Sequence, residues 1–296
     1  DLAMAVSHED ADEVHLGEFN TWRSTNGALT WTLTTDWTWG NPIGYTHCDI
    51  HEIVFYGGTI YVGSDGLISK STDGGDTWLN LTEGVSIRQF YRIGTSKNDA
   101  YKIMGGSQDN GTSVYTNDYW HEWLGADGME CVVDYTNSDI VYGTSQNGYF
   151  YKSTAGGNNG NVGISQPGGG NWVTPFVIHP TDPQTLYVGS SEVKKTINGM
   201  NSWSTISNFN MGNLDNLSIS ESNGDYLYTS KGSSIYRTSN GGASWANISN
   251  GLPNITISYI AIHPENPEII AVSLSGFNDG EKVFTSDNAG NSWTNY

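Results

Sequence analysis

Short hydrophobic runs separated by polar turns recur along most of the chain. The segments FVIHPTDPQTLYVGS (176–190), IAIHPENPEIIAVSL (260–274) and CVVDYTNSDIVYGTS (131–145) each contain two such runs. Within each segment, polar turn residues such as Asn, Asp and Pro separate two β-rich runs, which is the pattern of a tight hairpin. Because no segment keeps an apolar periodicity of 3.6 residues, the sequence predicts an all-β fold.

An octet with the pattern S/T-x-D/N-x-G-x-x-W follows the third predicted strand of each unit. Six copies end in tryptophan, and a degenerate seventh, STAGGNNG (153–160), ends in Gly160. The copies end at positions 31, 78, 123, 160, 203, 245 and 293, so successive ends are 37 to 48 residues apart. This spacing is close to that of a four-stranded propeller blade, about 40–50 residues. With a fourth strand after each octet, the sequence predicts a seven-bladed β-propeller of four-stranded antiparallel blades.

The octets are predicted to be structural turns. Their Ser/Thr and Asp/Asn side chains bond backbone amides, glycine accepts a positive φ, and the tryptophan folds back over the hairpin. The alternative for STDGGDTW (71–78) is a calcium ion held by Asp73 and Asp76. The residues assigned to the structural role are Asp73, Trp78, Trp31, Asp118, Trp123, Trp203, Asn240, Trp245 and Trp293.

No linker or block of charge divides the chain, so a single propeller domain is predicted over residues 1–296. Because the chain stops three residues after Trp293, we expect a longer precursor that carries further domains. The predicted blades span residues 1–40, 41–84, 85–127, 128–170, 171–210, 211–253 and 254–296.

The charge balance narrows the classes of partner. The chain has 31 acidic and 12 basic residues, a net charge of −19, which repels nucleic acid and anionic membrane surfaces. This negative charge is compatible with divalent cations, neutral polysaccharide or a basic protein as partners. No apolar run reaches 18 residues, so membrane insertion is not expected. The two cysteines, Cys48 and Cys131, allow either one disulfide or two free thiols.

A candidate metal site lies in THCDIHEI (46–53), which opens the second blade. His47, Asp49 and His51 alternate along a predicted strand and therefore should project to one side. Two imidazoles and a carboxylate are suitable ligands for zinc or another borderline metal. A divalent cation, calcium or zinc, is therefore the candidate cofactor.

Further polar residues fall at the start of the next blades, where a propeller gathers loops at the mouth of its channel. Gln108 and Asp109 lie in the glycine-rich turn GGSQDNGT (105–112), and Asp127 and Glu130 open the fourth blade. Trp172 lies in a glycine-rich loop without an octet role, and its ring could stack on a sugar or pack over the neighbouring loop. These five residues are candidate ligand-binding groups. The alternative is that the polar members only bond channel water and strand ends.

The octets resemble the Asp-box, or BNR, repeat found in sialidases, sortilin-type receptors, xyloglucanases and photosystem II assembly factors. Three more stretches, THCDIHEI, MGGSQDNGT (104–112) and GNWVTPFVIHP (170–180), resemble large secreted bacterial proteins of the sortilin-like or BNR glycosidase-like type. The resemblance covers nearly the whole chain and implies a propeller in a secreted or cell-surface protein. It does not specify an activity, because the box is scaffold in all of these families.

Sialidase activity is disfavoured, because it needs three convergent arginines and two of the chain's four, Arg23 and Arg237, directly precede octets. Only Arg88 and Arg92 remain. Xyloglucanases place two carboxylates between tandem propellers, so one alternative is a glycoside hydrolase half-site with Asp49 and either Asp109 or Asp127 as acid and base. Another is a structural scaffold in a surface or secretion assembly. The favoured expectation is an exported binding module for protein or polysaccharide.

Overall fold

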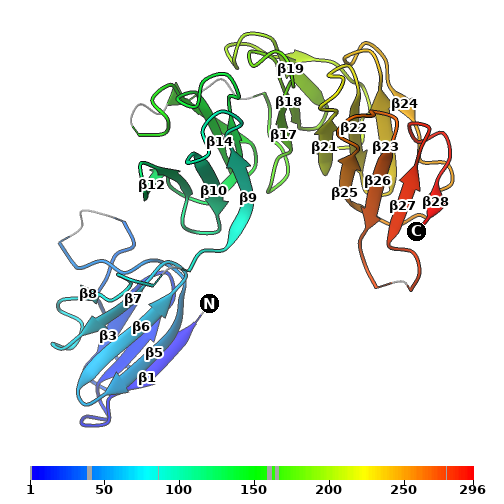
Figure 1. Cartoon of the computed structure of the whole chain (residues 1–296). Coiled ribbons are helices and arrows are strands. Elements are labelled where there is room, and N and C mark those ends of the chain that lie inside the picture. The colour runs from blue at the N-terminus through cyan, green and yellow to red at the C-terminus, as the bar shows by residue number, and fades with distance from the viewer. Residues whose placement is uncertain (1, 39–41, 86, 159–161, 164–166, 278) are drawn as a thin grey trace. The chain divides into compact units, whose positions relative to one another are not determined.

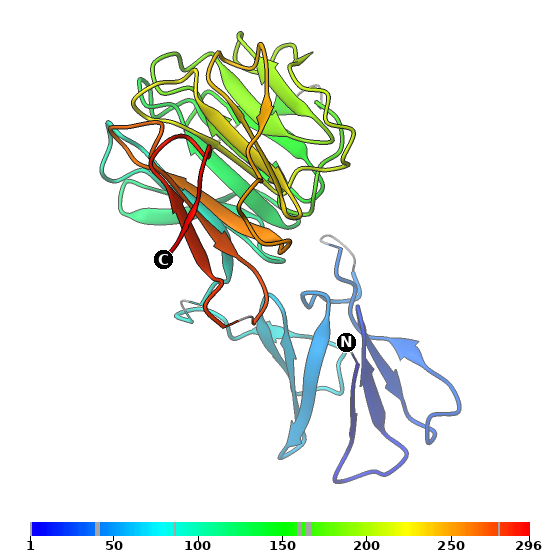
Figure 2. The ribbon, with the colours of Figure 1, turned by 90° about the vertical axis from the view of Figure 1, so that its right-hand side faces the viewer.

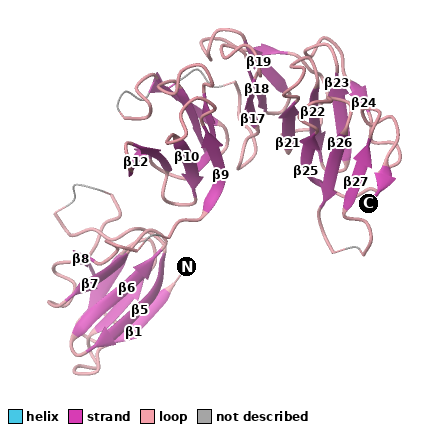
Figure 3. Cartoon of the chain, viewed as in Figure 1, coloured by secondary structure: helices cyan, strands magenta, loops and turns pink. Residues whose placement is uncertain are grey.

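The computed structural model describes residues 2–38, 42–85, 87–158, 162–163, 167–277 and 279–296. The chain divides into two compact units, residues 1–87 and 88–296, which are described separately below. All regular structure in the described ranges is β-strand (Figure 3). Within those ranges we find no helix with the length and apolar character needed to span a membrane.

The first unit consists of two four-stranded antiparallel sheets (Figure 1). In both sheets, each strand pairs with the next strand along the chain. The strands are β1 (Ala3–Val6), β2 (Val14–Gly17), β3 (Thr21–Ser24) and β4 (Thr32–Leu33), then β5 (Ile50–Tyr56), β6 (Thr59–Ser64), β7 (Ile68–Ser71) and β8 (Leu79–Asn80).

The second unit consists of five such sheets, which follow one another in chain order (Figure 1 and Figure 2). The first two contain β9 (Phe90–Thr95), β10 (Ile103–Ser107), β11 (Thr112–Thr116) and β12 (Tyr119–Leu124), then β13 (Gly128–Val133), β14 (Val141–Ser145), β15 (Tyr149–Ser153) and β16 (Val162–Gly163). The third contains β17 (Phe176–Ile178), β18 (Leu186–Gly189), β19 (Val193–Thr196) and β20 (Ser204–Thr205). The last two contain β21 (Asn216–Ile219), β22 (Leu227–Lys231), β23 (Ser234–Thr238) and β24 (Ala246–Asn247), then β25 (Ile257–Ile262), β26 (Ile270–Leu274), β27 (Val283–Ser286) and β28 (Thr294–Asn295).

The chain therefore has the predicted fold class, an all-β seven-bladed β-propeller with four antiparallel strands in each blade. Each sheet lies within one of the seven segments expected from the octet spacing. In the second unit, the first strands of successive blades, β9, β13, β17, β21 and β25, pack against one another in that order. We call these five strands the inner strands. That the whole chain is a single domain stays a prediction.

The octet turns have the hydrogen bonds expected from their residue types. In residues 71–78, the Ser71 hydroxyl donates to Asp73 Oδ1 at 2.7 Å and accepts from the Gly75 amide at 2.8 Å. Asp73 Oδ1 in turn accepts from the Thr77 amide at 2.9 Å. The octets that begin at residues 24, 196, 238 and 286 repeat this arrangement with Asn in place of Asp. Side chains thus replace the backbone ladder in these turns, as predicted.

Two octet tryptophans bond to the preceding blade, whereas we predicted that each would cover its own hairpin. The indole Nε1 of Trp245 donates to the Ile206 carbonyl at 2.7 Å, and that of Trp293 donates to the Ile248 carbonyl at 2.9 Å. Ile206 and Ile248 each lie three residues after the tryptophan of the previous octet. An indole N–H that is removed from water needs an acceptor, and the last strand of the neighbouring blade supplies it.

Basic side chains also join neighbouring blades. Arg237 Nη1, just before the octet of the sixth blade, donates to the Ala289 carbonyl in the next octet at 2.7 Å. Lys152 Nζ likewise reaches the Gly199 carbonyl at 3.2 Å. Two of the five basic residues that directly precede octets, Lys152 and Arg237, are therefore explained by contacts between blades rather than by an anion site.

The third blade lacks the octet turn that the sequence predicted. Residues 116–123 do not form an octet turn, because Asn117 and Asp118 take positive φ angles of 52° and 66° in a tight hairpin between β11 and β12. The segment has no glycine, whereas each octet that forms the wider turn has at least one. Asp118 is therefore a hairpin residue. Trp123 is still buried, and it packs with Met104 and Val114 in the core of this blade. Cys48 and Cys131 are not joined in a disulfide.

Candidate functional site

A cavity of about 730 Å³ opens on the inner strands of the second unit. We call it the inner-strand cavity. Its lining comes from all five blades and combines apolar residues, among them Ile93, Phe176, Leu217, Tyr259 and Ile260, with polar and charged ones. Ile93 and Tyr259 are each 61% exposed. Runs of consecutive residues on the inner strands contribute to the lining, including residues 216–219 and 258–262.

Arg92 and Glu130 form an ion pair on one side of the inner-strand cavity. Arg92 Nε, on β9, donates to Glu130 Oε1, on β13, at 2.8 Å. Burial raises the pKa of Glu130, and the neighbouring guanidinium opposes that rise. Of the four arginines, only Arg92 lines the cavity, so the three-arginine carboxylate clamp of a sialidase is not assembled there.

Asp215 also lines the cavity and is held by three donors. Its carboxylate accepts hydrogen bonds from the Gly232 amide at 2.7 Å, Lys231 Nζ at 2.9 Å and Asn171 Nδ2 at 2.8 Å. Burial alone would raise the pKa of Asp215, but these hydrogen bonds outweigh it and hold the pKa below its usual value. The cavity thus contains two carboxyl groups whose pKa values are displaced in opposite directions.

Trp172 lies beside the cavity, in the loop that leads into β17. Its side chain is 47% exposed, and its indole Nε1 donates to the hydroxyl of Tyr91 on β9 at 3.1 Å. Val173, the next residue, lines the cavity. The exposed ring is therefore fixed in orientation by a residue two blades earlier. Ligand binding by Trp172 stays a prediction.

Gln108, Asp109 and Asp127 come together in one turn, but Glu130 points elsewhere. Asp127 is buried, and its Oδ1 accepts from the Asp109 amide at 3.0 Å, which fastens the β10–β11 turn. The Gln108 amide donates to the Gln89 carbonyl at 3.0 Å. A bulge between Gly128 and Cys131 separates the direction of Asp127 from that of Glu130. Of these four, the cavity receives only Glu130.

In the first unit, His47, Asp49 and His51 do not alternate along one strand as predicted. Asp49 has a positive φ of 59°, β5 begins only at Ile50, and a bulge follows within the strand. His51 Nε2 instead makes a short hydrogen bond to the carboxylate of Asp65 in the β6–β7 turn. His47 packs so closely on Gly66 that a side chain there would collide with its ring.

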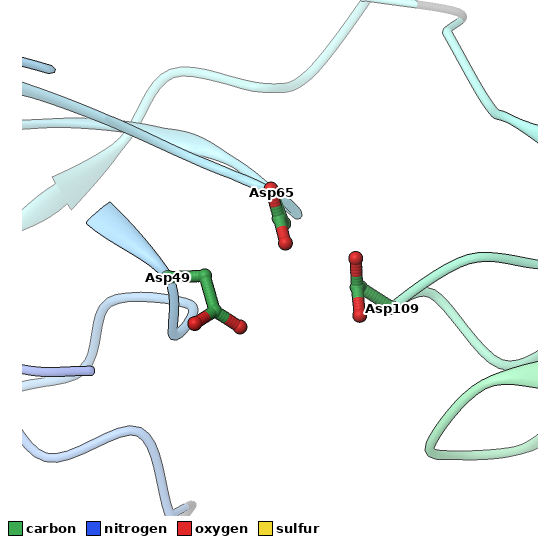
Figure 4. A group of neighbouring side chains, drawn as sticks. All are labelled: Asp49, Asp65 and Asp109. Carbon is green, nitrogen blue, oxygen red and sulfur yellow. The ribbon is translucent and has the colours of Figure 1, made fainter. Parts of the chain in front are cut away.

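Asp65 is the residue in this region that sequence reasoning missed. Its carboxylate oxygen lies within 4.8 Å of one from Asp49 (Figure 4, which also draws Asp109 of the second unit). Among the described residues of the first unit, no three potential ligand atoms of His, Cys, Asp or Glu lie that close together. Metal binding by His47, Asp49 and His51 stays a prediction. Only the SDG turn sequence (64–66) marked Asp65 beforehand, and such turns are common.

The alternative calcium ligands of the second octet have separate surroundings. Hydrogen bonds from Thr77 and Ser71 lower the pKa of Asp73 to about 2. Asp76 instead faces Arg23, with its Oδ1 3.6 Å from the guanidinium. Asp73 is thus engaged in the turn itself, and calcium binding here also stays a prediction.

No known protein family's sequence profile matches the chain, and no curated protein matches it either. Among solved structures, a GH74 enzyme from Niastella koreensis matches with 15% identity and a TM-score of 0.36, over 98% of this chain and 62% of the other. YCF48 from Cyanidioschyzon merolae matches with 12% identity and a TM-score of 0.48, over 96% and 94%. A chain of the mitotic checkpoint complex matches with 9% identity and a TM-score of 0.50, over 93% and 85%.

These similarities concern the fold alone. The present chain spans 62% of the length of the GH74 enzyme chain. The chain is thus a seven-bladed β-propeller with an inner-strand cavity in its second unit.

Proposed function

We propose that this chain is an exported binding module of a secreted or cell-surface protein, and that its inner-strand cavity receives an extended segment of a partner protein. The observation that carries the proposal is the cavity itself. It has the size of a ligand site, and its lining offers both apolar side chains and oriented polar groups to a ligand. We infer further that the octets are Asp-box repeats, which is the basis for the proposed extracellular location.

The net charge of the chain favours a partner segment with basic side chains. In the lining, the carboxyl groups of Glu130, Asp215 and Glu221 each lie beside one basic side chain, that of Arg92, Lys231 and Lys97 respectively. The whole chain has a net charge of −19, which attracts basic partners and speeds their encounter. The exposed side chains of Ile93 and Tyr259 supply apolar area that a bound segment would remove from water.

The experiment is selection of a displayed library of random 12-residue peptides on the whole chain, followed by surface plasmon resonance with the enriched peptides. Ile93→Asp should weaken their binding at least about tenfold, since it removes an apolar contact and adds a charge to the cavity wall. Ile197→Asp is the matched control, because Ile197 is 70% exposed in an octet outside the cavity. Equal binding of the selected peptides to both variants would overturn the proposal.

A glycoside hydrolase half-site is the second candidate, and one observation favours it. Glu130 and Asp215 line the same cavity and their pKa values are displaced in opposite directions, as in an acid–base pair. Of the acids that we first considered for this role, Asp127 is engaged in fastening a turn. Release of reducing ends from soluble neutral polysaccharides, abolished by Glu130→Gln, would support hydrolysis. No release would leave the binding module as the function.

A further inference from the structure

A second concave site lies at the outer rim of the second unit, between the blade of β17–β20 and the blade of β21–β24. Its volume is about 610 Å³. We call it the rim cleft. It is lined by three aromatic residues, Phe209, Tyr236 and Trp245, and by polar residues at its edge that include Thr205, Ser207 and Asn208.

The three aromatic rings form one cluster. The ring centroids of Phe209 and Tyr236 are 4.4 Å apart with an interplanar angle of 38°, and those of Phe209 and Trp245 are 5.4 Å apart at 80°. All three side chains are partly exposed. The cluster therefore presents aromatic surface to the cleft instead of closing on itself.

The loop that carries Phe209 is held in place by a single carboxylate. Glu192 Oε1 accepts from the amides of Phe209 and Asn210 at 2.7 and 2.8 Å, and Oε2 accepts from the hydroxyl of Ser207. That hydroxyl also accepts from the Val193 amide at 2.8 Å. A ligand would thus meet an ordered loop, which lowers the entropy cost of binding.

The next blade junction along the chain shows that neither Phe209 nor Glu192 is needed to join blades. There Trp293 bonds Ile248 as Trp245 bonds Ile206, and the Ile235 amide donates to Ser249 as Val193 donates to Ser207. In this repeat alignment Gly251 stands where Phe209 stands, and Ser234 stands where Glu192 stands. The aromatic ring and the carboxylate that orders its loop are therefore additions to the common junction.

The lining of the rim cleft has no ionisable Asp, Glu, Lys, Arg or His side chain among the residues that form it. It offers partly exposed aromatic faces next to hydroxyl and amide groups. Aromatic faces attract the C–H face of a sugar ring, and the surrounding hydroxyl and amide groups are donors and acceptors for sugar hydroxyls. The charged groups next to the lining are already engaged, because Lys194 Nζ donates to Thr205 Oγ1 at 2.7 Å and the Glu192 carboxylate accepts from the Phe209 loop. We propose that the rim cleft binds a ring of a neutral saccharide, independently of the inner-strand cavity.

The test uses the whole chain with four neutral tetrasaccharides, cellotetraose, maltotetraose, mannotetraose and chitotetraose, in saturation-transfer NMR and isothermal titration calorimetry. At least one should bind, and Phe209→Gly, which copies the neighbouring junction, should weaken it at least about tenfold. Ala243→Glu, which places a charge at an exposed residue of the cleft lining, provides a second variant that leaves the aromatic cluster intact and should weaken binding similarly.

The Ile93→Asp variant of the inner-strand cavity is the control and should bind the saccharide as the wild type does. Failure of all four sugars to bind would overturn the proposal. So would unchanged affinity in both rim-cleft variants. If Ile93→Asp alone abolished binding, the sugar would belong to the inner-strand cavity, and the rim-cleft proposal would be wrong.

Discussion

The octet turns and the inner-strand cavity differ in whether their residue types recur from blade to blade. In the octet turns, the same residue types recur blade after blade: a hydroxyl, an Asn or Asp, glycines and a tryptophan. In the cavity, each blade contributes a different residue, such as Arg92, Glu130 and Asp215. Repeated residues form the octet turns and, at Trp245 and Trp293, the bonds between blades, whereas the residues that line the cavity differ from blade to blade. The rim cleft follows the same distinction, because Phe209 and Glu192 are not repeated at the next blade junction, where Gly251 and Ser234 stand.

The largest effect that would test this contrast comes from a repeated glycine. Gly242 has a φ of +94°, and a Cβ there would lie 2.3 Å from Ile206 Cδ1. Gly242→Ala should therefore lower the free energy of unfolding by about 3 kcal/mol, through backbone strain and a forced shift at the junction. Urea unfolding followed by tryptophan fluorescence measures it.

Gly276→Ala separates the two causes. Gly276 has a φ of +79° but no atom within 4 Å of an added Cβ, so only the backbone term of about 1 kcal/mol is expected. Equal losses in the two variants would show that the close approach of blades contributes nothing.

An intermediate effect is expected in the cavity, and it should depend on pH. Burial raises the pKa of Glu130 and Arg92 opposes that rise, so Arg92→Met leaves a carboxyl that is tolerated when neutral and costly when charged. The variant should match the wild type near pH 4 and become less stable as pH rises, by about 1 kcal/mol at pH 7.

Thermal unfolding of both proteins at several pH values would measure this difference. Arg88→Met is the control, because Arg88 is exposed and donates to a backbone carbonyl, that of Asn110. A pH-independent loss in Arg92→Met would contradict the role assigned to the ion pair.

The smallest effect concerns the one described octet turn that uses Asp where the others use Asn. The pKa of Asp73 is lowered to about 2 from an ordinary value of 3.8, so its contribution to stability is present above about pH 4 and lost as pH falls toward 2. Asp73→Asn keeps the acceptor for Ser71 and Thr77, and its urea midpoint should fall less between pH 4 and pH 2 than that of the wild type. An identical fall in both proteins would show that Asn and Asp are equivalent in this turn.

Several parts of the site depended on contacts that no sequence pattern encodes. Arg92 and Glu130 are 38 residues apart and meet only because β9 packs beside β13. The pairing of His51 with Asp65 also required the fold, since the positive φ of Asp49 and the bulge in β5 broke the predicted alternation. Asp127 was expected at the channel mouth and instead fastens a turn.

The sequence by itself determined the strands, the number of blades and the chemistry of most turns. These depend on side chains that act within a few residues of one another, as Ser71, Asp73 and Thr77 do. The third blade was misjudged where glycine was missing from the octet. Only the tertiary structure decided which blade each tryptophan joins, and which charges share the cavity. Those outcomes depend on how neighbouring blades pack against each other, which the sequence of one strand does not specify.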